Sequence, residues 1–517
     1  MKNIKTIFFL VFLITACIAV IIFPSCLSND TNTKNNNENA NTDVNENLEE
    51  SSQNGNIEEP QADPRQLVSD DLPDTDLNGY TFRIYTHNYA AGGHADFVVD
   101  YCPESQIGEV INDSVYQRNR TVEERFNCNV VTVDSGAGTD ISKHSQSIKK
   151  IISAGDDAFD IALEHCILGC NLSLEGLFLN LYDIEHFNFD KPWWYKNTND
   201  EMTVMGQMYM GSNAIFYSGI AETWALYVNK NLIADFGLEM PYKDVFDGTW
   251  TIDKLISLTK DVYTDVNGDG VRDGSDVYGF AALSVEMNFF TSLEVPILEK
   301  TDVGVEIVVN NERTFNVIDK LYDWFYTTQG CNTPEYGKII DGMEVYPYIH
   351  WAFSNGKALV VSGMIGDAVN FYRSADVQYG LLPHPKWDEN QKSYRSFATD
   401  EFFVIPNTAP DSSRTGLIVE AMAAEGYKQI YPAYYEVALK NKYMHDDESV
   451  QILDIIVNSR NIAFSYTYDN WQGFGHMLND LFTAKPTKDF ASYYEKRTGS
   501  AQKRVDTINK SFDEMEK

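Results

Sequence analysis

Hydrophobic and polar side chains alternate with a period of two from Tyr80 to Thr86, directly after an Asn-Gly pair. Alternation of this kind after a turn signal predicts a strand. Apolar residues then recur at helical spacing between residues 110 and 126, and the β-branched run 130–133 follows them. A second helix, ending at Gly155, leads to the short apolar segment AFDIALEH. This β-α-β order predicts a largely parallel sheet with helices on its faces.

A similar alternation recurs in the middle of the chain. The segment AETWALYVNKNLIADFG, residues 221–237, predicts a strand through Val228 and a helix closed by Gly237. The last third is predicted to be mostly helical, because segments such as TGLIVEAMAAEGY and SVQILDIIVNS carry apolar residues at spacings of three and four. The chain has 517 residues. That length exceeds what one hydrophobic core usually serves, so we expect about two large lobes.

The first residues have the pattern of an export signal. Lys2 and Lys5 precede an uncharged apolar run at 6–23, and Cys17 and Cys26 stand where a bacterial lipoprotein signal places its lipidated residue. Cys26 is favoured, because cleavage at Cys17 would leave the apolar segment IAVIIF exposed. We therefore expect a signal peptide at 1–26 and a lipid-anchored protein on the extracytoplasmic face of the bacterial cell membrane. An uncleaved anchor helix would give the same topology.

Residues 27–76 are predicted to be a disordered acidic, Asn-rich tether. The stretch from Leu27 to Asp76 contains no aromatic residue, and a flexible chain of that length reaches about 40 Å. The whole chain has a formal net charge of -36. We therefore expect no nucleic-acid partner, since phosphate binding requires clustered Lys and Arg.

The cysteines do not form a complete disulfide pattern. Five cysteines lie beyond the signal, Cys102, Cys128, Cys166, Cys170 and Cys331, and an odd number leaves at least one unpaired. Cys102 with Cys128 is a possible bridge. Cys166 and Cys170 lie next to His165 at helical spacing, but no second ligand pair with zinc-type spacing follows, so buried structural cysteines are the favoured interpretation.

The segment DVNGDGVRDGSD, Asp265 to Asp276, has the spacing of a calcium-binding loop. Its predicted metal ligands are Asp265, Asn267, Asp269, the carbonyl of Val271, Asp273 and Asp276. Gly270 permits the sharp turn that brings these oxygens together. The loop occurs once and precedes strand-like sequence, and its twelfth residue is Asp rather than Glu. We therefore predict a structural calcium that braces a helix to the next strand; an acidic turn without metal is the alternative.

The sequence around this loop resembles a known family. Residues 224–280, WALYVNKNLIADFGLEMPYKDVFDGTWTIDKLISLTKDVYTDVNGDGVRDGSDVYGF, are similar to the central signature of family 1 extracellular solute-binding proteins of ABC importers. The matching residues are Tyr227, Asn229, Lys230, Gly237, Leu238, Pro241, Thr249, Trp250 and Tyr278 to Phe280. FSNGKALVVSG, residues 353–363, and the segment 375–413 resemble further parts of the family's pattern.

The resemblance implies an α/β fold of the type II periplasmic-binding-protein class, with two α/β lobes, hinge crossings and a ligand cleft between the lobes. On this basis we expect lobe 1 to comprise 77–190 plus 375–430, and lobe 2 to comprise 191–374 plus 431–517. The stretch 281–326 departs from the family's pattern, which leaves the ligand class open.

The family most often binds sugars or oligosaccharides, so aromatic and carboxylate side chains at predicted loops are the candidate ligand contacts. Aromatic faces stack on pyranose rings, and carboxylates accept hydrogen bonds from hydroxyls. The candidates are Trp193, Trp194, Glu222, Trp224, Trp351, Asp400, Glu401 and Trp471. A single tryptophan is more often a core residue than a ligand contact, but several of these together are expected to line the cleft.

The resulting expectation is a carbohydrate receptor, anchored by lipid, that delivers its ligand to ABC permease subunits. A calcium-dependent surface adhesin, or a carbohydrate-binding protein without transport, is the alternative. No common catalytic motif is present, and adjacent carboxylates such as Asp400 and Glu401 point to opposite faces of a strand, so an enzyme is not expected.

Overall fold

The computed structural model describes residues 63–87, 101–283, 287–334, 338–340, 342–399, 401–444 and 446–516. The predicted signal segment, Cys17, Cys26 and most of the predicted tether lie outside these residues. Within them, no helix combines the length and the apolar character that crossing a bilayer requires.

The end of the predicted tether is part of the folded unit. Residues 64–67 form a short 3-10 helix, and the Gln66 side chain donates to the carbonyl of Lys428. Asp70 pairs with Arg125, and Asp71 pairs with Lys191 at 2.6 Å. The folded unit therefore begins before Leu77, where it was predicted to start. Ion pairs to the folded body fix this segment, although its composition is typical of a disordered tether.

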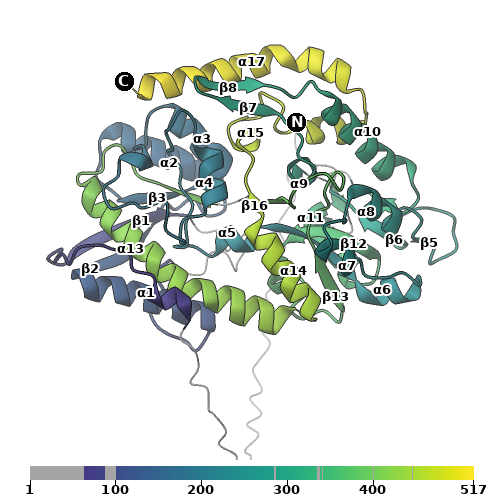
Figure 1. Ribbon diagram of the computed structural model, residues 1–517, viewed down its shortest axis with the longest axis horizontal. Helices are drawn as coiled ribbons and strands as arrows, with labels where there is room; N and C mark the ends of the chain where they lie inside the picture. Colours follow the sequence, from purple (N-terminus) through teal and green to yellow (C-terminus); the bar gives the residue numbers. More distant parts are fainter. Residues whose placement is uncertain are drawn as a thin grey trace, which may run out of the picture. The chain divides into compact units, whose positions relative to one another are not determined.

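Lobe 1 is built on a 4-stranded sheet in the order β15-β3-β1-β2. Its strands are β1 (Tyr80–Thr86), β2 (Cys128–Asp134), β3 (Ile161–His165) and β15 (Glu401–Val404). The first three are mutually parallel, and β15 runs antiparallel to β3. Helices α1 (Val110–Phe126) and α13 (Ser412–Tyr431) lie side by side along one face, and α2 (Ile141–Ala154) and α3 (Cys166–Leu174) lie along the other (Figure 1). The β-α-β order predicted for this region is confirmed.

Local signals set the ends of these helices. Asp140 caps α2 by accepting a hydrogen bond from the Lys143 N–H at 2.9 Å, and Gly155 ends the helix at a φ of 73°. Glycine adopts this left-handed conformation at little cost, so the helix stops at the residue that the sequence predicts.

Lobe 2 is built on a 6-stranded sheet, in which β13-β4-β12-β6-β5 form the main path and β9 pairs with β6. Its strands are β4 (Trp224–Asn229), β5 (Tyr263–Thr264), β6 (Val277–Ala281), β9 (Cys331–Asn332), β12 (Ala358–Met364) and β13 (Tyr379–Leu382). Its helices are α6 (Lys230–Asp235), α7 (Tyr242–Phe246), α8 (Ile252–Thr259), α9 (Met287–Ser292), α10 (Glu312–Thr327), α11 (Val345–Ser354) and α12 (Asp367–Asn370). β6 and β12 are parallel, so their carboxyl ends share one edge of the sheet.

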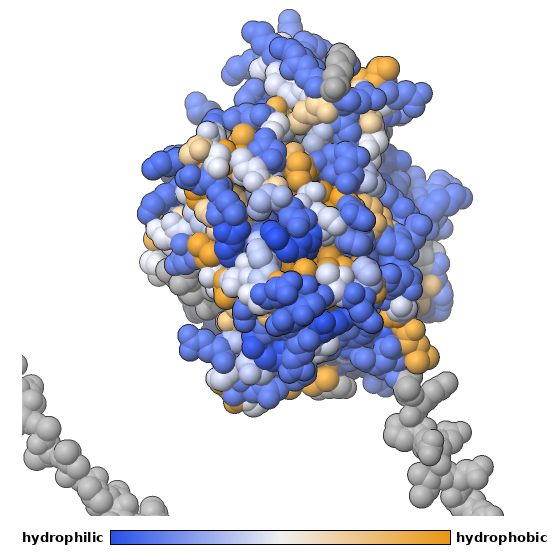
Figure 2. Space-filling view, turned by 90° about the vertical axis from the view of Figure 1, so that its left-hand side faces the viewer, coloured by the Kyte–Doolittle hydropathy of each residue, from blue (hydrophilic) through white to orange (hydrophobic). Residues whose placement is uncertain are grey.

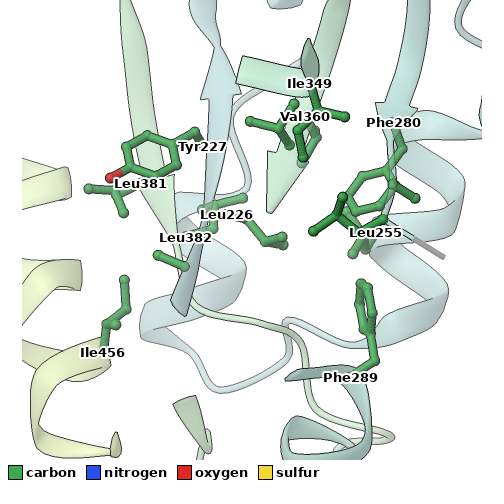
Figure 3. Close-up of a cluster of buried hydrophobic side chains, with 14 of the residues drawn as sticks. Leu226, Tyr227, Leu255, Phe280, Phe289, Ile349, Val360, Leu381, Leu382 and Ile456 are labelled. Atoms are coloured by element: carbon green, nitrogen blue, oxygen red, sulfur yellow. The ribbon is translucent and has the colours of Figure 1, made fainter. Parts of the chain in front are cut away.

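The core of lobe 2 lies between this sheet and its helices. Figure 3 shows Leu226 and Tyr227 of β4, Val360 of β12 and Phe280 of β6 among side chains that helices contribute, including Leu255 and Ile456. These side chains are almost completely buried. Full burial of one such side chain stabilises the folded state by about 1.5–3 kcal/mol.

The remaining elements complete the two lobes. They are α4 (Lys196–Met202), α5 (Ser218–Ala221), the β10 (Ile339–Ile340) and β11 (Met343–Glu344) pair, a π-helix at Pro432–Tyr443, α14 (Asp447–Asn458), α15 (Phe464–Thr467), α16 (Met477–Phe482) and α17 (Phe490–Met515). The helical character predicted for the last third is confirmed. The side of the molecule seen in Figure 2 is largely hydrophilic, with hydrophobic residues in separate groups.

The segments that join the lobes lie side by side. β14 (Ser396–Phe397) pairs in parallel with β16 (Arg460–Asn461), and Thr223 forms a bridge with Ala398. These segments therefore form one hinge region between the two sheets.

The structure divides the chain differently from the predicted lobe boundaries. β13 belongs to lobe 2, because it pairs with β4 from Tyr379 to Leu382. Residues 193–216 contribute Trp193, Met208 and Phe216 to the core of lobe 1, although they lie beyond the predicted boundary at 190. Contacts between residues far apart in the sequence decide which lobe these segments join. The local sequence pattern carries no information about those contacts.

The segment that departs from the family pattern forms a hairpin and two helices. β7 (Leu298–Thr301) and β8 (Gly304–Ile307) are antiparallel and lie between α9 and α10 in the chain. The flanking residues Ile297 and Val309 belong to the core of lobe 2, whereas Val305 of β8 is buried in the core of lobe 1. α17 passes along this hairpin (Figure 1). The hairpin thus connects the lobes at a second place, apart from the hinge.

Candidate functional site

The carboxyl ends of the parallel strands identify where a ligand would bind. In open α/β sheets, ligands bind outside these ends. In lobe 1, β3 ends at His165, which pairs with Glu401 at the start of β15. Two residues before Glu401, Thr399 contacts Glu222, which lies two residues before Trp224, the first residue of β4 in lobe 2. The candidate site is therefore the region where both sheet edges meet the hinge segments.

Glu222 is held at the hinge. It caps the short helix α5, and the Thr399 hydroxyl donates to its Oε2 at 3.2 Å. The Thr399 N–H also approaches the Glu222 carbonyl at 3.4 Å. The carboxylate is half-buried, so it is fixed by the two crossing segments and still reaches solvent at the sheet edge.

Trp224 forms an aromatic cluster with two residues that the sequence analysis did not identify. Its ring lies 5.9 Å from Tyr346, and Tyr346 lies 6.0 Å from Phe371, both in edge-to-face contact. All three side chains are half-buried. Trp224 pairs with Met364, the last residue of β12, so the cluster lies at the carboxyl edge of lobe 2. The indole N–H of Trp224 is buried without a hydrogen-bond partner among the described groups, which leaves a donor for a ligand or a water.

A buried carboxyl group fixes the orientation of Tyr346. Asp367 accepts hydrogen bonds from the Tyr346 hydroxyl at 2.5 Å and from the Met364 N–H at 2.6 Å. Burial raises the pKa of Asp367 to about 7, and burial lowers the pKa of the neighbouring His350 to about 3. His350 is therefore uncharged at neutral pH. Tyr346 and Phe371 lie far from Trp224 in sequence, and no local motif marked them.

Trp471 is exposed, with 49% of its surface accessible. Its indole stacks on His476 at 4.8 Å, and His476 lies 4.6 Å from Tyr466. Tyr466 in turn contacts Phe397 of β14 at 5.1 Å. A series of three ring contacts therefore links Trp471 to β14 in the hinge region.

Trp193 and Trp194 lie elsewhere, in the core of lobe 1. Their exposed fractions are 0% and 3%. Both indole N–H groups donate to Glu420, at 2.9 and 3.1 Å. Burial raises the pKa of Glu420 to about 7. With their faces packed and their donors used, these two residues stabilise the core and are not brought to the candidate site.

The other predicted ligand residues have different positions. Trp351 stacks on Tyr348 at 6.0 Å near the end of α11, and β12 begins a few residues later, so Trp351 lies toward the amino end of that strand. β12 extends over 7 residues, about 23 Å, before its carboxyl edge. Glu401 opens β15 opposite His165, and Asp400 lies outside the described residues.

His165 is a further candidate at the edge of lobe 1. Its Nδ1 accepts a hydrogen bond from the Ile167 N–H at 3.2 Å and so caps α3, which places the ring proton on Nε2. Burial lowers the pKa of His165 to about 4, so the ring is a neutral donor. The sequence analysis considered this residue only beside Cys166 and Cys170.

The described cysteines are not paired in disulfides. No disulfide joins the described cysteines, Cys102, Cys128, Cys166, Cys170 and Cys331, so the possible Cys102–Cys128 bridge is not formed. Cys170 donates to the carbonyl of Cys166 at 2.9 Å, and burial raises the pKa of the Cys170 thiol. The interpretation of these two as buried structural cysteines agrees with this packing.

The acidic loop between β5 and β6 is held by its own hydrogen bonds. Asp265 accepts from the N–H groups of Gly268 and Gly270, at 2.7 and 2.9 Å. Asp276 is fully buried and accepts from the Tyr263 hydroxyl at 3.0 Å. Among the described residues, no group of three or more His, Cys, Asp or Glu side chains is placed to hold a metal ion. Calcium at this loop stays a hypothesis that rests on the spacing of the ligands.

Comparison with known proteins identifies the fold. No protein-family model and no curated protein sequence matches the chain. Among solved structures, UgpB from Mycobacterium tuberculosis in complex with glycerophosphocholine matches with a TM-score of 0.52 at 14% identity, over 83% of this chain and 99% of that chain. An ABC transporter solute-binding protein from Agrobacterium radiobacter K84 in complex with ribitol matches with a TM-score of 0.50 at 13% identity, over 83% and 100% of the two chains. The chain therefore has the two-lobed α/β fold of an ABC transporter solute-binding protein.

Proposed function

We propose that this protein is a non-catalytic receptor that captures a carbohydrate and delivers it to an ABC permease. The observation that carries the proposal is the site at the hinge, where the Trp224, Tyr346 and Phe371 rings form a cluster at the carboxyl edge of lobe 2 and Glu222, two residues before Trp224, accepts a hydrogen bond from Thr399. Aromatic faces and a fixed acceptor are the groups that recognise the apolar face and the hydroxyls of a sugar. The fold shared with a ribitol-bound solute-binding protein supports the same class of ligand.

The proposed ligand contacts are those that the fold brings to the hinge. Trp224, Glu222 and Trp471 come from the sequence analysis, and Tyr346 and His165 come from the structure. The neutral His165 ring offers a donor from lobe 1, and the Trp224 indole N–H, which has no partner among the described groups, offers one from lobe 2. A polyol or sugar hydroxyl both accepts and donates, so it can satisfy these groups and Glu222 together.

A thermal-shift screen tests this function. The chain from Leu27 onward is screened against mono- and oligosaccharides, with ribitol and glycerophosphocholine included because similar structures hold them. A ligand that binds only the folded form raises the melting temperature as its concentration passes its dissociation constant. A response from one sugar series supports the proposal. A cooperative melt without response to any sugar contradicts it and favours the adhesin, for which a gene neighbourhood without permease subunits is the second criterion.

The cellular location is part of the proposal. We infer that the mature chain is anchored by a lipid on Cys26, with Cys17 as the alternative, on the extracytoplasmic face of the membrane. Metabolic labelling with a palmitate analogue tests it: Cys26→Ser should abolish the label, whereas Cys17→Ser should not. Loss of the label in Cys17→Ser but not in Cys26→Ser would move the anchor to Cys17. A wild-type protein that takes up no label would refute the lipid anchor.

A bound calcium also belongs to the proposal. Asp265, Asn267, Asp269, the Val271 carbonyl, Asp273 and Asp276 are the residues that would hold it. The spacing supports this assignment, and the hydrogen bonds inside the loop give the alternative, a turn that is stable without metal.

A further inference from the structure

The loop that carries Trp471 has a strained backbone. Asn470 and Trp471 are successive residues with φ of 47° and 54°. Asparagine tolerates this left-handed region, but a bulky residue such as tryptophan is an outlier there. Strain of this kind persists only where the surrounding structure fixes it, and it concentrates at functional sites.

A neighbouring ring supports the Trp471 indole. The indole stacks on the His476 ring at a centroid distance of 4.8 Å, with an interplanar angle of 20°. His476 is itself fixed by a contact of its Nε2 with the Tyr466 carbonyl at 3.2 Å. Burial lowers the pKa of His476 to about 4, so the supporting ring is neutral. Trp471 thus has a rigid support below it and nearly half of its surface exposed.

Residues of α17 hold the backbone of this loop. Arg497 donates from Nη2 to the Trp471 carbonyl at 2.5 Å and from Nε to the Gly473 carbonyl at 2.9 Å. Ser500, one helical turn later, donates to the Gln472 carbonyl at 2.7 Å. Three successive carbonyls of the loop therefore accept hydrogen bonds from one face of a single helix.

Lobe 1 holds the other side of the loop. The Asn171 side chain of α3 donates to the Asn470 Oδ1 at 3.1 Å, and Arg504 of α17 donates to the Asn171 Oδ1 at 2.9 Å. The loop also packs tightly on its own flank, because a Cβ on Gly475 would lie 1.9 Å from the Ser465 carbonyl oxygen. The conformation of Trp471 is thus determined by contacts from three directions.

We propose that Arg497 and Ser500 of α17, with Asn171 of α3, are positioning residues that hold Trp471 as a preformed platform for one flat, apolar ligand face. The inference rests on the proposed function, because it assigns these residues to the same site. A fixed ring loses little conformational freedom when the ligand arrives, so the contacts of α17 contribute to affinity without touching the ligand.

Hydrogen exchange tests the positioning without any ligand. Arg497→Lys keeps the charge but cannot bond both carbonyls, and Lys496→Ala, an exposed neighbour on the same helix, is the matched control. Amides of residues 470–475 should exchange about tenfold faster in Arg497→Lys than in the wild type. In Lys496→Ala their exchange rates should equal those of the wild type. Equal exchange in the Arg497→Lys variant and the wild type would overturn the proposal.

Calorimetric titration with maltotriose and xylotriose tests the consequence for binding. For a sugar that binds, Arg497→Lys should weaken the dissociation constant about tenfold while the melting temperature stays near that of Lys496→Ala. In a Trp471→Ala background the same substitution should have no further effect on binding. A fall in melting temperature without a change in affinity would make Arg497 merely structural. If neither sugar binds the wild type, the choice of carbohydrate fails, and the exchange result still decides the positioning.

Discussion

At the scale of single residues, the predicted site contains both ligand and core positions. Glu222 and Trp224 lie at the hinge, whereas Trp193 and Trp194 serve Glu420 in the core of lobe 1. Sequence alone did not separate them, because a pair of tryptophans between two predicted elements has the same pattern in a core and in a cleft. Tyr346 and Phe371 could not be found from the sequence, since their proximity to Trp224 depends on the register of β4 against β12.

The first prediction contrasts two residues that the sequence analysis proposed as ligand contacts, Glu222 and Trp351. Glu222→Gln should weaken binding of the sugar that gives the largest thermal shift by about 10- to 100-fold, because a charged acceptor is lost while the side chain keeps its shape. Trp351→Phe, at the amino end of β12, should leave the affinity unchanged. Isothermal titration of both variants checks this. The site would be misplaced if Trp351→Phe lost affinity and Glu222→Gln kept it.

The second prediction concerns Asp367 and pH. Burial raises its folded-state pKa to about 7, above the ordinary value of 3.8. The folded protein therefore holds a proton that the unfolded chain releases, and this contribution to stability is present at low pH and is lost as the pH rises toward 7. Asp367→Asn resembles the protonated acid, so its cost should shrink by about 1.4 kcal/mol per pH unit in this window.

Urea unfolding of wild type and Asp367→Asn at pH 5 and pH 8 measures this difference. Asp376→Asn, at an exposed aspartate on the same lobe, is the matched control. A cost of Asp367→Asn that grows with pH would mean that the carboxylate is ionised in the fold and stabilised by Tyr346 and the Met364 N–H.

At the scale of elements, local patterns predicted the repeating units well. The strand at 80–86, a strand at the run 130–133 and the helix ending at Gly155 follow from periodicity and caps, and they are confirmed, with the second strand extending over 128–134. The start of the folded unit before Leu77 was missed, because the pairs of Asp70 with Arg125 and of Asp71 with Lys191 are long-range. The hairpin of β7 and β8 was also missed, since its buried residue Val305 packs on the other lobe.

The third prediction concerns the loop between β5 and β6. If calcium binds there, adding it at 100 times its dissociation constant should stabilise the wild type by about 2.7 kcal/mol, which appears as a rise in melting temperature. The variant with Asp265→Asn and Asp269→Asn should show no rise, and Asp388→Asn, in a different loop, should respond like the wild type. A melting temperature that is insensitive to calcium in all of them would identify the loop as a turn held by its own hydrogen bonds.

At the scale of the whole molecule, the lobes are joined by more than the hinge. Asn509 of α17 accepts from the Val305 N–H at 2.8 Å and donates to the Val305 carbonyl at 3.0 Å, as a neighbouring strand would. Lys300 of β7 donates to the carbonyls of Asp200 and Glu201, at 2.8 and 2.6 Å. Helix α17 itself contributes Ala501 to the core of lobe 2 and Ile508 to the core of lobe 1.

These connections lead to the last prediction, that the lobes unfold as one cooperative unit. Lobe 2 cannot unfold alone without withdrawing Val305 from the core of lobe 1, so the wild type should show one calorimetric transition. Asn509→Ala leaves two backbone groups of β8 without partners and should separate the transitions or broaden them, with a cost of about 1–3 kcal/mol. Gln502→Ala, exposed on the same helix, should melt like the wild type. Two resolved transitions already in the wild type would show that the hairpin and α17 do not couple the lobes, and that the hinge alone joins them.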